Sequence, residues 1–425
     1  MRNPRFLALT TLEKVENGAF IQDAFDPKGL KEADRNLAET IVYGTVQNKL
    51  FLDYVIRRFV KKLENLDQNI RQLLRMALYQ MHFLDRVPDH AIVNETVKMA
   101  KVISNVGASG LVNGVLRQVI REGDEAFEVH VDDDVRRLAV TYSFPEEWVR
   151  YFERLLKDET EAFLKSTFDP APLTLRPVSV DAEALIGELE EEGFACESIK
   201  PRPAVVVKHP RGLFETTAYK EGRFYVQDAA SQAVVSLFTP DKEAQAMDLC
   251  AAPGGKSFQM AEIFSHVDAF DASAERLVRM EENIRRLGYK NIATAVRDGK
   301  TPLPKKKYDR ILVDAPCTGL GLIRRKPEIK YRIGYDDVLQ MARVQRLLLE
   351  NAYNALNDGG ELVYSTCSVT VEENEGVLHS FLSDHPECRL KEKGTRYWPH
   401  RHGTDGFTMA CIVRKDPNAL DGNDA

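Results

Sequence analysis

The chain has 425 residues, of which 44% are hydrophobic and 29% charged, and its formal net charge is −7 at pH 7. These values are typical of a globular protein with two or three domains, and they exclude a largely disordered chain. No apolar run approaches the ~20 residues of a membrane helix, and no apolar signal segment follows the N-terminus. We therefore expect a cytoplasmic protein without a membrane partner.

The six cysteines are scattered along the chain, without a Cys-x-x-Cys pair and without clustered histidines. Such spacing argues against a zinc site and against a disulfide framework. We therefore expect free thiols and no metal.

Residues 1–130 are predicted to form an all-α domain. Ile70, Leu73, Leu74, Ala77 and Leu78 recur at intervals of three and four residues, which places them on one face of a helix. Several stripes of this kind, joined by short connections, predict a helical bundle.

Residues 140–225 have a different pattern, which predicts a small α+β connecting domain. Segments 172–177 and 204–208 have the composition of strands, and residues 182–192 have that of a helix ending at Gly193.

Residues 226–415 alternate strand and helix signals, as in a doubly wound α/β sheet. One long helix is predicted over 336–356, ending at Gly359-Gly360, and the acidic tail 416–425 is predicted to be disordered. Strands are expected at Ala246–Leu249, Val267–Asp271, Ala293–Arg297, Arg310–Val313 and Glu361–Tyr364, with a last pair between Phe407 and Arg414.

Three short motifs follow predicted strands of this last domain. They are Cys250-Ala251-Ala252-Pro253-Gly254-Gly255-Lys256, Asp314-Ala315-Pro316-Cys317 and Ser365-Thr366-Cys367-Ser368. Because ligands of open α/β sheets bind at the carboxyl ends of the strands, the motifs are expected to border one crevice. The glycine turn is not Gly-x-Gly-x-x-Gly, which disfavours a dinucleotide.

Cys317 and Cys367 are candidate nucleophiles. Either cysteine alone is more simply explained as a buried apolar residue, but two at neighbouring strand ends favour a chemical role. The spacing does not say which of them attacks.

A local excess of positive charge follows in the same region. Residues 285–332 contain 14 Lys and Arg against 4 Asp and Glu. Arg324, Arg325 and Lys326 come shortly after Cys317, and we expect this triplet to contact a phosphate backbone.

The three motifs together resemble the RNA 5-methylcytosine methyltransferases. A second resemblance, to the RNA-binding domain of the NusB family, rests on Ala33–Leu37, Glu39–Gly44 and Leu111–Arg117. The combination resembles bacterial small-subunit ribosomal RNA cytosine-5 methyltransferases of the Sun/Fmu type, with a NusB-like bundle, a connecting domain and a Rossmann-like methyltransferase domain.

This resemblance implies S-adenosylmethionine as cofactor and small-subunit (16S) ribosomal RNA as partner. It assigns attack on C6 of a cytosine to Cys367, product release to Cys317, and a hydrogen bond to the base to Asp314. The cofactor-binding residues that it implies are Cys250, Ala251, Ala252, Pro253, Gly254, Gly255, Lys256, Asp271, Asp298 and Asp314.

Three other functions stay open from the sequence. One is a Rossmann oxidoreductase, which the missing dinucleotide fingerprint disfavours. Another is an RNA-binding scaffold without activity, and the third is the same reaction on transfer RNA. We expect a monomer.

Overall fold

The computed structural model of the chain describes residues 3–199, 204–303 and 306–416. The tail predicted at residues 416–425 lies, apart from Asp416, outside the described residues. By their internal contacts the residues form two compact units, Met1–Asp169 with Ile323–Arg332, and Pro170–Leu322 with Ile333–Ala425. We call them the helical unit and the sheet unit. The division into three domains that the sequence suggests stays a prediction.

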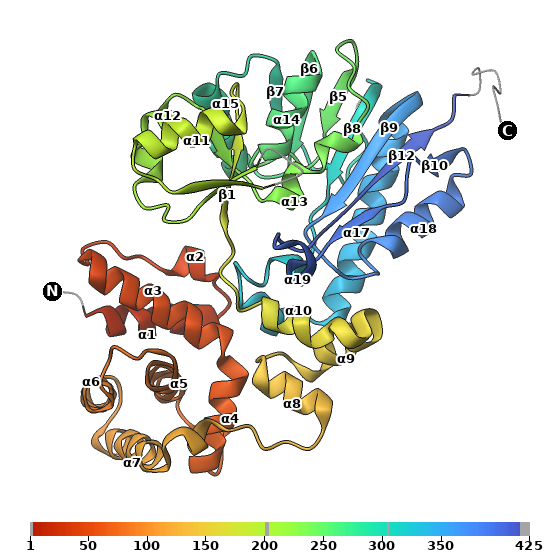
Figure 1. Cartoon of the computed structure of the whole chain (residues 1–425). Coiled ribbons are helices and arrows are strands. Elements are labelled where there is room, and N and C mark those ends of the chain that lie inside the picture. The colour runs from red at the N-terminus through yellow and green to blue at the C-terminus, as the bar shows by residue number, and fades with distance from the viewer. Residues whose placement is uncertain (1–2, 200–203, 304–305, 417–425) are drawn as a thin grey trace. The chain divides into compact units, whose positions relative to one another are not determined.

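The helical unit confirms the predicted N-terminal bundle (Figure 1). None of the helices in the described part of the chain is both long and apolar enough to cross a membrane. The helices of this unit are α1 (Pro4–Glu16), α2 (Ile21–Ala24), α3 (Glu32–Gln47), α4 (Lys49–Phe59), α5 (Gln68–Phe83), α6 (Asp89–Ile103), α7 (Val106–Glu122), α8 (Asp134–Thr141), α9 (Glu146–Leu156), α10 (Thr160–Ser166) and α16 (Ile329–Arg332).

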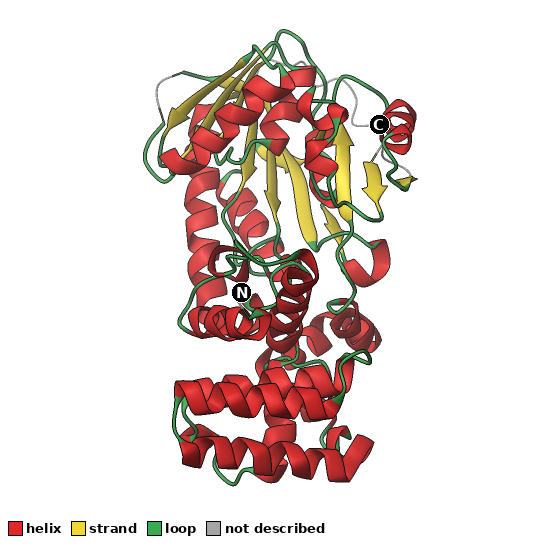
Figure 2. Ribbon diagram, turned by 90° about the vertical axis from the view of Figure 1, so that its left-hand side faces the viewer, coloured by secondary structure: helices red, strands yellow, loops and turns green. Residues whose placement is uncertain are grey.

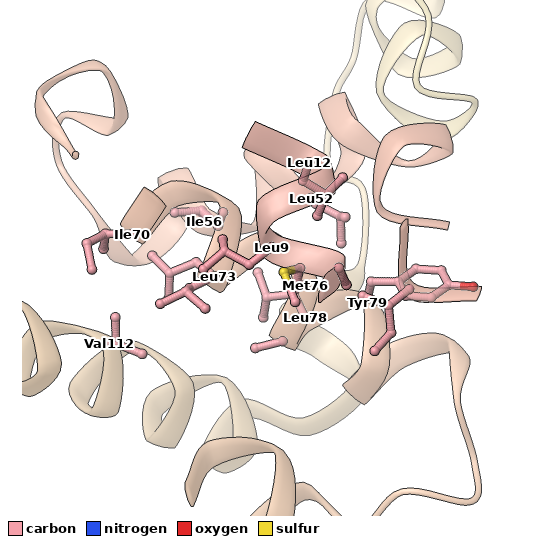
Figure 3. Packing of buried hydrophobic residues seen from close by; sticks show 14 of the residues in the cluster. Leu9, Leu12, Leu52, Ile56, Ile70, Leu73, Met76, Leu78, Tyr79 and Val112 are labelled. Carbon is pink, nitrogen blue, oxygen red and sulfur yellow. The ribbon is translucent and has the colours of Figure 1, made fainter. Parts of the chain in front are cut away.

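Helix α5 forms the centre of this bundle. Asp67 caps it by accepting hydrogen bonds from the backbone N–H groups of Asn69 (2.9 Å) and Ile70 (3.3 Å). Its residues from Gln72 to Gln80 are all buried, so α5 is buried on every side and not only along one stripe. Figure 3 shows Leu73, Met76 and Leu78 of α5 packed among leucine and isoleucine side chains of neighbouring helices.

The sheet unit begins with a small antiparallel sheet of strand order β2-β3-β1-β4. The sequence predicts β1 (Leu173–Pro177), β3 (Ala204–Val207) and helix α11 (Ala182–Glu191), and the structure confirms them. It does not predict β2 (Cys196–Ile199), which is short and half polar, or β4 (Phe224–Val226), which has only three residues.

The large sheet has the order β10-β12-β9-β8-β5-β6-β7, with β11 paired to β12. Strands β9, β8, β5, β6 and β7 are mutually parallel, and β12 is antiparallel to β9. The strands are β5 (Gln245–Asp248), β6 (His266–Asp271), β7 (Ile292–Val296), β8 (Tyr308–Asp314), β9 (Leu356–Thr366), β10 (Cys388–Leu390), β11 (Thr395–Tyr397) and β12 (Phe407–Arg414).

Helices cover both faces of this sheet, as Figure 2 shows. Helices α17 (Tyr335–Ala355) and α18 (Glu375–Asp384) pack on one face. Helices α13 (Ala229–Gln232), α14 (Gly255–Ile263) and α15 (Ala274–Leu287) pack on the other. The doubly wound arrangement predicted for this part of the chain is therefore confirmed.

Two details of the prediction are wrong. Residues 407–414 form one strand, β12, and not a pair; its antiparallel partners are β9, β10 and β11. Helix α17 ends at Ala355, and the glycines expected to terminate it lie at the start of β9. The helix ends before them because Leu356 already pairs with Tyr308 of β8.

Candidate active site

The structure brings the two predicted thiols together. Strands β8 and β9 are parallel neighbours, and Asp314 at the end of β8 is in register with Ser365. The loops that follow place Cys317 Sγ 3.0 Å from Cys367 Sγ. The expectation that these two strands are adjacent is confirmed, and the thiols can face one substrate base.

The surroundings of Cys317 favour its neutral thiol. The hydrogen bond with Cys367 is the first cause that raises the pKa of Cys317 well above its ordinary value, followed by burial and by the charges of Glu373 and Asp314. An S–H group at Cys317 can therefore donate a hydrogen bond to a thiolate at Cys367.

Asp314 lies beside this pair and is held from two sides. Lys256 Nζ lies 2.7 Å from Asp314 Oδ2, and Ser365 Oγ donates to Oδ1 at 2.7 Å. The Lys256 ammonium also lies 5.1 Å from the centroid of the Phe407 ring. The sequence assigns Lys256 to the cofactor loop, and the structure adds that its charged end reaches the carboxylate next to the thiols.

The glycine turn after β5 is also organised by a buried carboxylate. Asp248 accepts a hydrogen bond from Ser257 Oγ at 2.6 Å, and burial raises its pKa to about 7. Gly254 has a φ of +111° at the start of α14, and a Cβ atom there would lie 2.3 Å from the Phe258 ring. Asp248 is not among the residues predicted from the sequence, although an acidic residue within an apolar strand is a detectable signal.

The other predicted cofactor residues of this turn and the next strand lie close together. Burial raises the pKa of the Cys250 thiol, as is typical of a cysteine that packs as a small apolar residue. Asp271 ends β6 and accepts hydrogen bonds from the backbone N–H groups of Ala252 (3.1 Å) and Ser273 (2.9 Å). The N-cap of α15 is Ser273, so Asp271 does not cap that helix.

Asp298 follows β7, the strand next to β6. Its carboxylate lies 3.4 Å from Lys300 Nζ and is partly exposed. The chemistry of these residues fits S-adenosylmethionine: carboxylates stand at successive strand ends, and the backbone of the glycine turn is open at a helix N-terminus. The assignment of Asp271 to the ribose hydroxyls and of the glycine turn to the amino-acid part stays a prediction.

A close backbone contact joins the two cysteine loops. Gly321 N donates to Cys367 O at 3.0 Å, and Gly406 N donates to Gly321 O at 2.9 Å. A Cβ atom on Gly321 would lie 1.9 Å from Gly406 O and 2.8 Å from Cys367 O. Sequence reasoning missed this contact, because the approach of three separate segments is not visible in a local pattern.

The predicted phosphate-binding triplet falls in the segment that belongs to the helical unit. Lys326 Nζ lies 5.2 Å from the ring centroid of Phe20, and Arg332 donates to Val15 O at 2.8 Å. In the same segment Lys330 is fully buried and donates to Gln47 O at 2.8 Å. Its burial lowers its pKa well below the ordinary value. Lys330 therefore anchors the segment, and the role of Arg324, Arg325 and Lys326 with RNA stays a prediction.

Known proteins resemble this chain over nearly its whole length. The sequence model described as "16S rRNA methyltransferase RsmB/F" matches residues 235–413, and the NusB family model matches residues 2–121. A Bacillus subtilis (strain 168) protein named "Probable ribosomal RNA small subunit methyltransferase B" is 34% identical, covering 97% of this chain and 98% of its own. The ribosomal RNA small subunit methyltransferase B of Proteus mirabilis (strain HI4320) is 32% identical, covering 91% and 92%.

Solved structures agree with the sequence matches. The structure titled "Crystal Structure of PH0851" has a TM-score of 0.80 at 27% identity, covering 97% of this chain and 99% of its own. NSun6 from Pyrococcus horikoshii, solved with SFG, has a TM-score of 0.59 at 26% identity, covering 64% of this chain and 99% of its own. The chain therefore belongs to the RsmB/F family of 16S rRNA methyltransferases, with S-adenosylmethionine as its cofactor.

Proposed function

We propose that the protein methylates C5 of a cytosine in small-subunit ribosomal RNA, through a transient bond between Cys367 Sγ and C6 of the base. The observation that carries this proposal is the thiol pair, with Cys317 Sγ 3.0 Å from Cys367 Sγ at the ends of adjacent strands. A methyl transfer to nitrogen or oxygen needs no thiol, whereas C5 of cytosine is a poor nucleophile until another group adds at C6.

The Cys367 thiolate bonds to C6, and the electron pair of the C5–C6 double bond becomes available at C5. The bound cofactor supplies an electrophilic methyl group. After C5 has gained the methyl, a base removes the C5 proton, the double bond re-forms and the Sγ–C6 bond breaks.

Asp314 and Lys256 support the addition step in this proposal. The Asp314 carboxylate, held 2.7 Å from Lys256 Nζ, is suited to hydrogen-bond the N3–N4 edge of the cytosine. The hydrogen bond with Cys367 is the first cause of the raised pKa of Cys317, and this bond is lost when Cys367 Sγ bonds to C6. Cys317 can then release its proton to solvent and act as the base that accepts the C5 proton.

The helical unit and the triplet Arg324–Lys326 supply RNA contacts in this proposal. The match of residues 2–121 to the NusB family supports a substrate-docking role for the bundle. Transfer RNA remains the alternative substrate, and the names of the relatives favour ribosomal RNA.

The test uses the purified full chain, S-adenosylmethionine labelled on the methyl group, and either 16S ribosomal RNA or bulk transfer RNA. Product RNA is digested to nucleosides and separated by chromatography. The proposal predicts label in 5-methylcytidine from ribosomal RNA. Label in a different nucleoside would contradict C5 chemistry, and label only in transfer RNA would contradict the substrate.

A further inference from the structure

Glu373 is a buried carboxylate that the mechanism above does not use. It lies six residues after Cys367 and two residues before the start of α18, and its side chain is fully buried. Buried carboxylates are costly unless their oxygens are well supplied with hydrogen-bond donors. The position of those donors shows what the residue holds in place.

Five donors converge on the two oxygens of Glu373. Oε1 accepts from Thr318 N at 2.8 Å and from Gln345 Nε2 at 3.1 Å. Oε2 accepts from Thr318 Oγ1 at 2.6 Å, from Thr370 Oγ1 at 2.9 Å and from Ser368 Oγ. The donors are hydroxyls, an amide and a backbone N–H, so the carboxylate is bound by neutral groups.

Two of the residues that donate to Glu373 directly follow the two cysteines. Thr318 is the residue after Cys317, and Ser368 is the residue after Cys367. One carboxylate therefore bridges the loops that carry both thiols. Gln345 extends the bridge to the other side of Cys317, because its Nε2 also donates to Pro316 O at 3.0 Å.

The backbone of Glu373 is fixed as well. Tyr364, near the end of β9, donates its hydroxyl to Glu373 O at 2.6 Å. The neighbouring Asn374 side chain accepts from Thr366 Oγ1 at 2.6 Å and donates to Thr370 O at 2.7 Å. The carboxylate is thus held rigidly relative to strand β9 and can set the position of the loop after β8.

We propose that Glu373 is a positioning residue that sets the separation and orientation of the Cys317 and Cys367 thiols in the methyl-transfer reaction. This proposal rests on the proposed function, in which both thiols act on one base. Glu373 does not touch the substrate; it acts through Thr318 and Ser368. A displacement of about 1 Å in a catalytic group can cost about 100-fold in rate, so a bridge of this kind affects turnover more than binding.

The charge of Glu373 has a second effect on the same pair. It is one of the causes that raise the pKa of Cys317, after the hydrogen bond with Cys367 and burial. Removal of the charge should therefore lower the pKa of this thiol even where the hydrogen bonds persist.

Glu373→Gln and Glu373→Ala separate geometry from charge. In the glutamine variant the amide oxygen can still accept from Thr318 N, and the amide nitrogen faces hydroxyls that can rotate to accept. The alanine variant loses all five hydrogen bonds of the carboxylate. Glu375→Gln is the matched control, because Glu375 is an exposed carboxylate two residues away.

Turnover is measured with labelled cofactor and RNA at varied concentrations of each. We expect Glu373→Ala to lower kcat about 100-fold with KM for both substrates within about twofold, Glu373→Gln to recover most of kcat, and the control to match wild type. Unchanged kcat in Glu373→Ala would overturn the proposal, and so would an equal loss in the glutamine and alanine variants.

Alkylation of Cys317 by iodoacetamide across a pH series, read by mass spectrometry, gives a readout besides activity. In Glu373→Gln the midpoint of labelling should move to lower pH, and this holds even where the alanine variant fails to fold. An unmoved midpoint would contradict the influence of Glu373 on the pair. If the wild-type enzyme makes no 5-methylcytidine, the proposed function itself is contradicted. If the wild-type enzyme is active and the Glu373 variants are equally active, only the positioning role of Glu373 is contradicted.

Discussion

Gly321→Ala should disable the reaction without disturbing cofactor binding. Gly321 sits between the loop after Cys367 and Gly406, and its N–H donates to Cys367 O at 3.0 Å. An added Cβ would lie 1.9 Å from Gly406 O, whereas ordinary contact begins at 3.4 Å, so the segments must separate by about 1.5 Å. The backbone of Gly321 does not have a positive φ, so the effect is steric only.

The size of this displacement sets the expected loss. Because a shift of about 1 Å in a catalytic group can cost about 100-fold, we expect kcat to fall by at least that factor. The carbonyls that must move belong to rigid backbone, one of them at Cys367 itself, so a side chain cannot turn aside to relieve the contact.

Methyl transfer to RNA and cofactor affinity by calorimetry are measured on the same preparations. Gly187→Ala is the matched control, because a Cβ on this helical glycine of α11 meets nothing within 4 Å. That control should keep full activity and gain up to about 1 kcal/mol in stability. Full turnover in Gly321→Ala would refute the reasoning that this contact fixes the thiol pair.

Three further results are expected. Asp248 has a pKa of about 7 in the fold against an ordinary 3.8, so its contribution to stability is full below pH 3.8 and is lost as pH rises through 7. The unfolding free energy of Asp248→Asn relative to wild type should therefore increase between pH 4 and pH 8, by up to about 4 kcal/mol in denaturant unfolding. A difference that does not change with pH would contradict the raised pKa. Asp271→Ala should weaken S-adenosylmethionine binding about 10- to 100-fold by calorimetry, and unchanged affinity would remove Asp271 from the site. Replacing Arg324–Lys326 with alanines should flatten the dependence of log RNA affinity on log salt, and an unchanged slope would show that the triplet is a solvated surface.

The sequence alone was sufficient for the parts of the site that lie at strand ends. The carboxyl ends of parallel strands meet at one edge of a sheet. The three motifs that begin at Cys250, Asp314 and Ser365 each follow a predicted strand, so the sequence alone predicts that they lie together. The proximity of Cys317 and Cys367 follows from that rule. The buried strands β5, β6, β8 and β9 were predicted because such strands have short, strongly apolar runs.

Other parts depend on long-range packing and could not be predicted. Glu372, Glu373 and Glu375 follow one another closely in the sequence, and no periodicity shows that only Glu373 is fully buried. The segment Ile323–Arg332 groups with the helical unit although it is far from residues 1–169 in sequence. The buried amino group of Lys330 donates to the carbonyls of Gln47 and Tyr142, and a basic run in the sequence gives no sign of such partners.

The covalent role of Cys367 is tested most directly by denaturing gels of protein mixed with labelled RNA and S-adenosylmethionine. Cys367→Ala should show neither turnover nor a protein–RNA adduct. Cys317→Ala should attack and methylate but release slowly, so that an adduct accumulates, because addition and elimination are separate steps. An adduct in Cys367→Ala with none in Cys317→Ala would reverse the two roles, and activity without adducts in both variants would contradict the covalent mechanism.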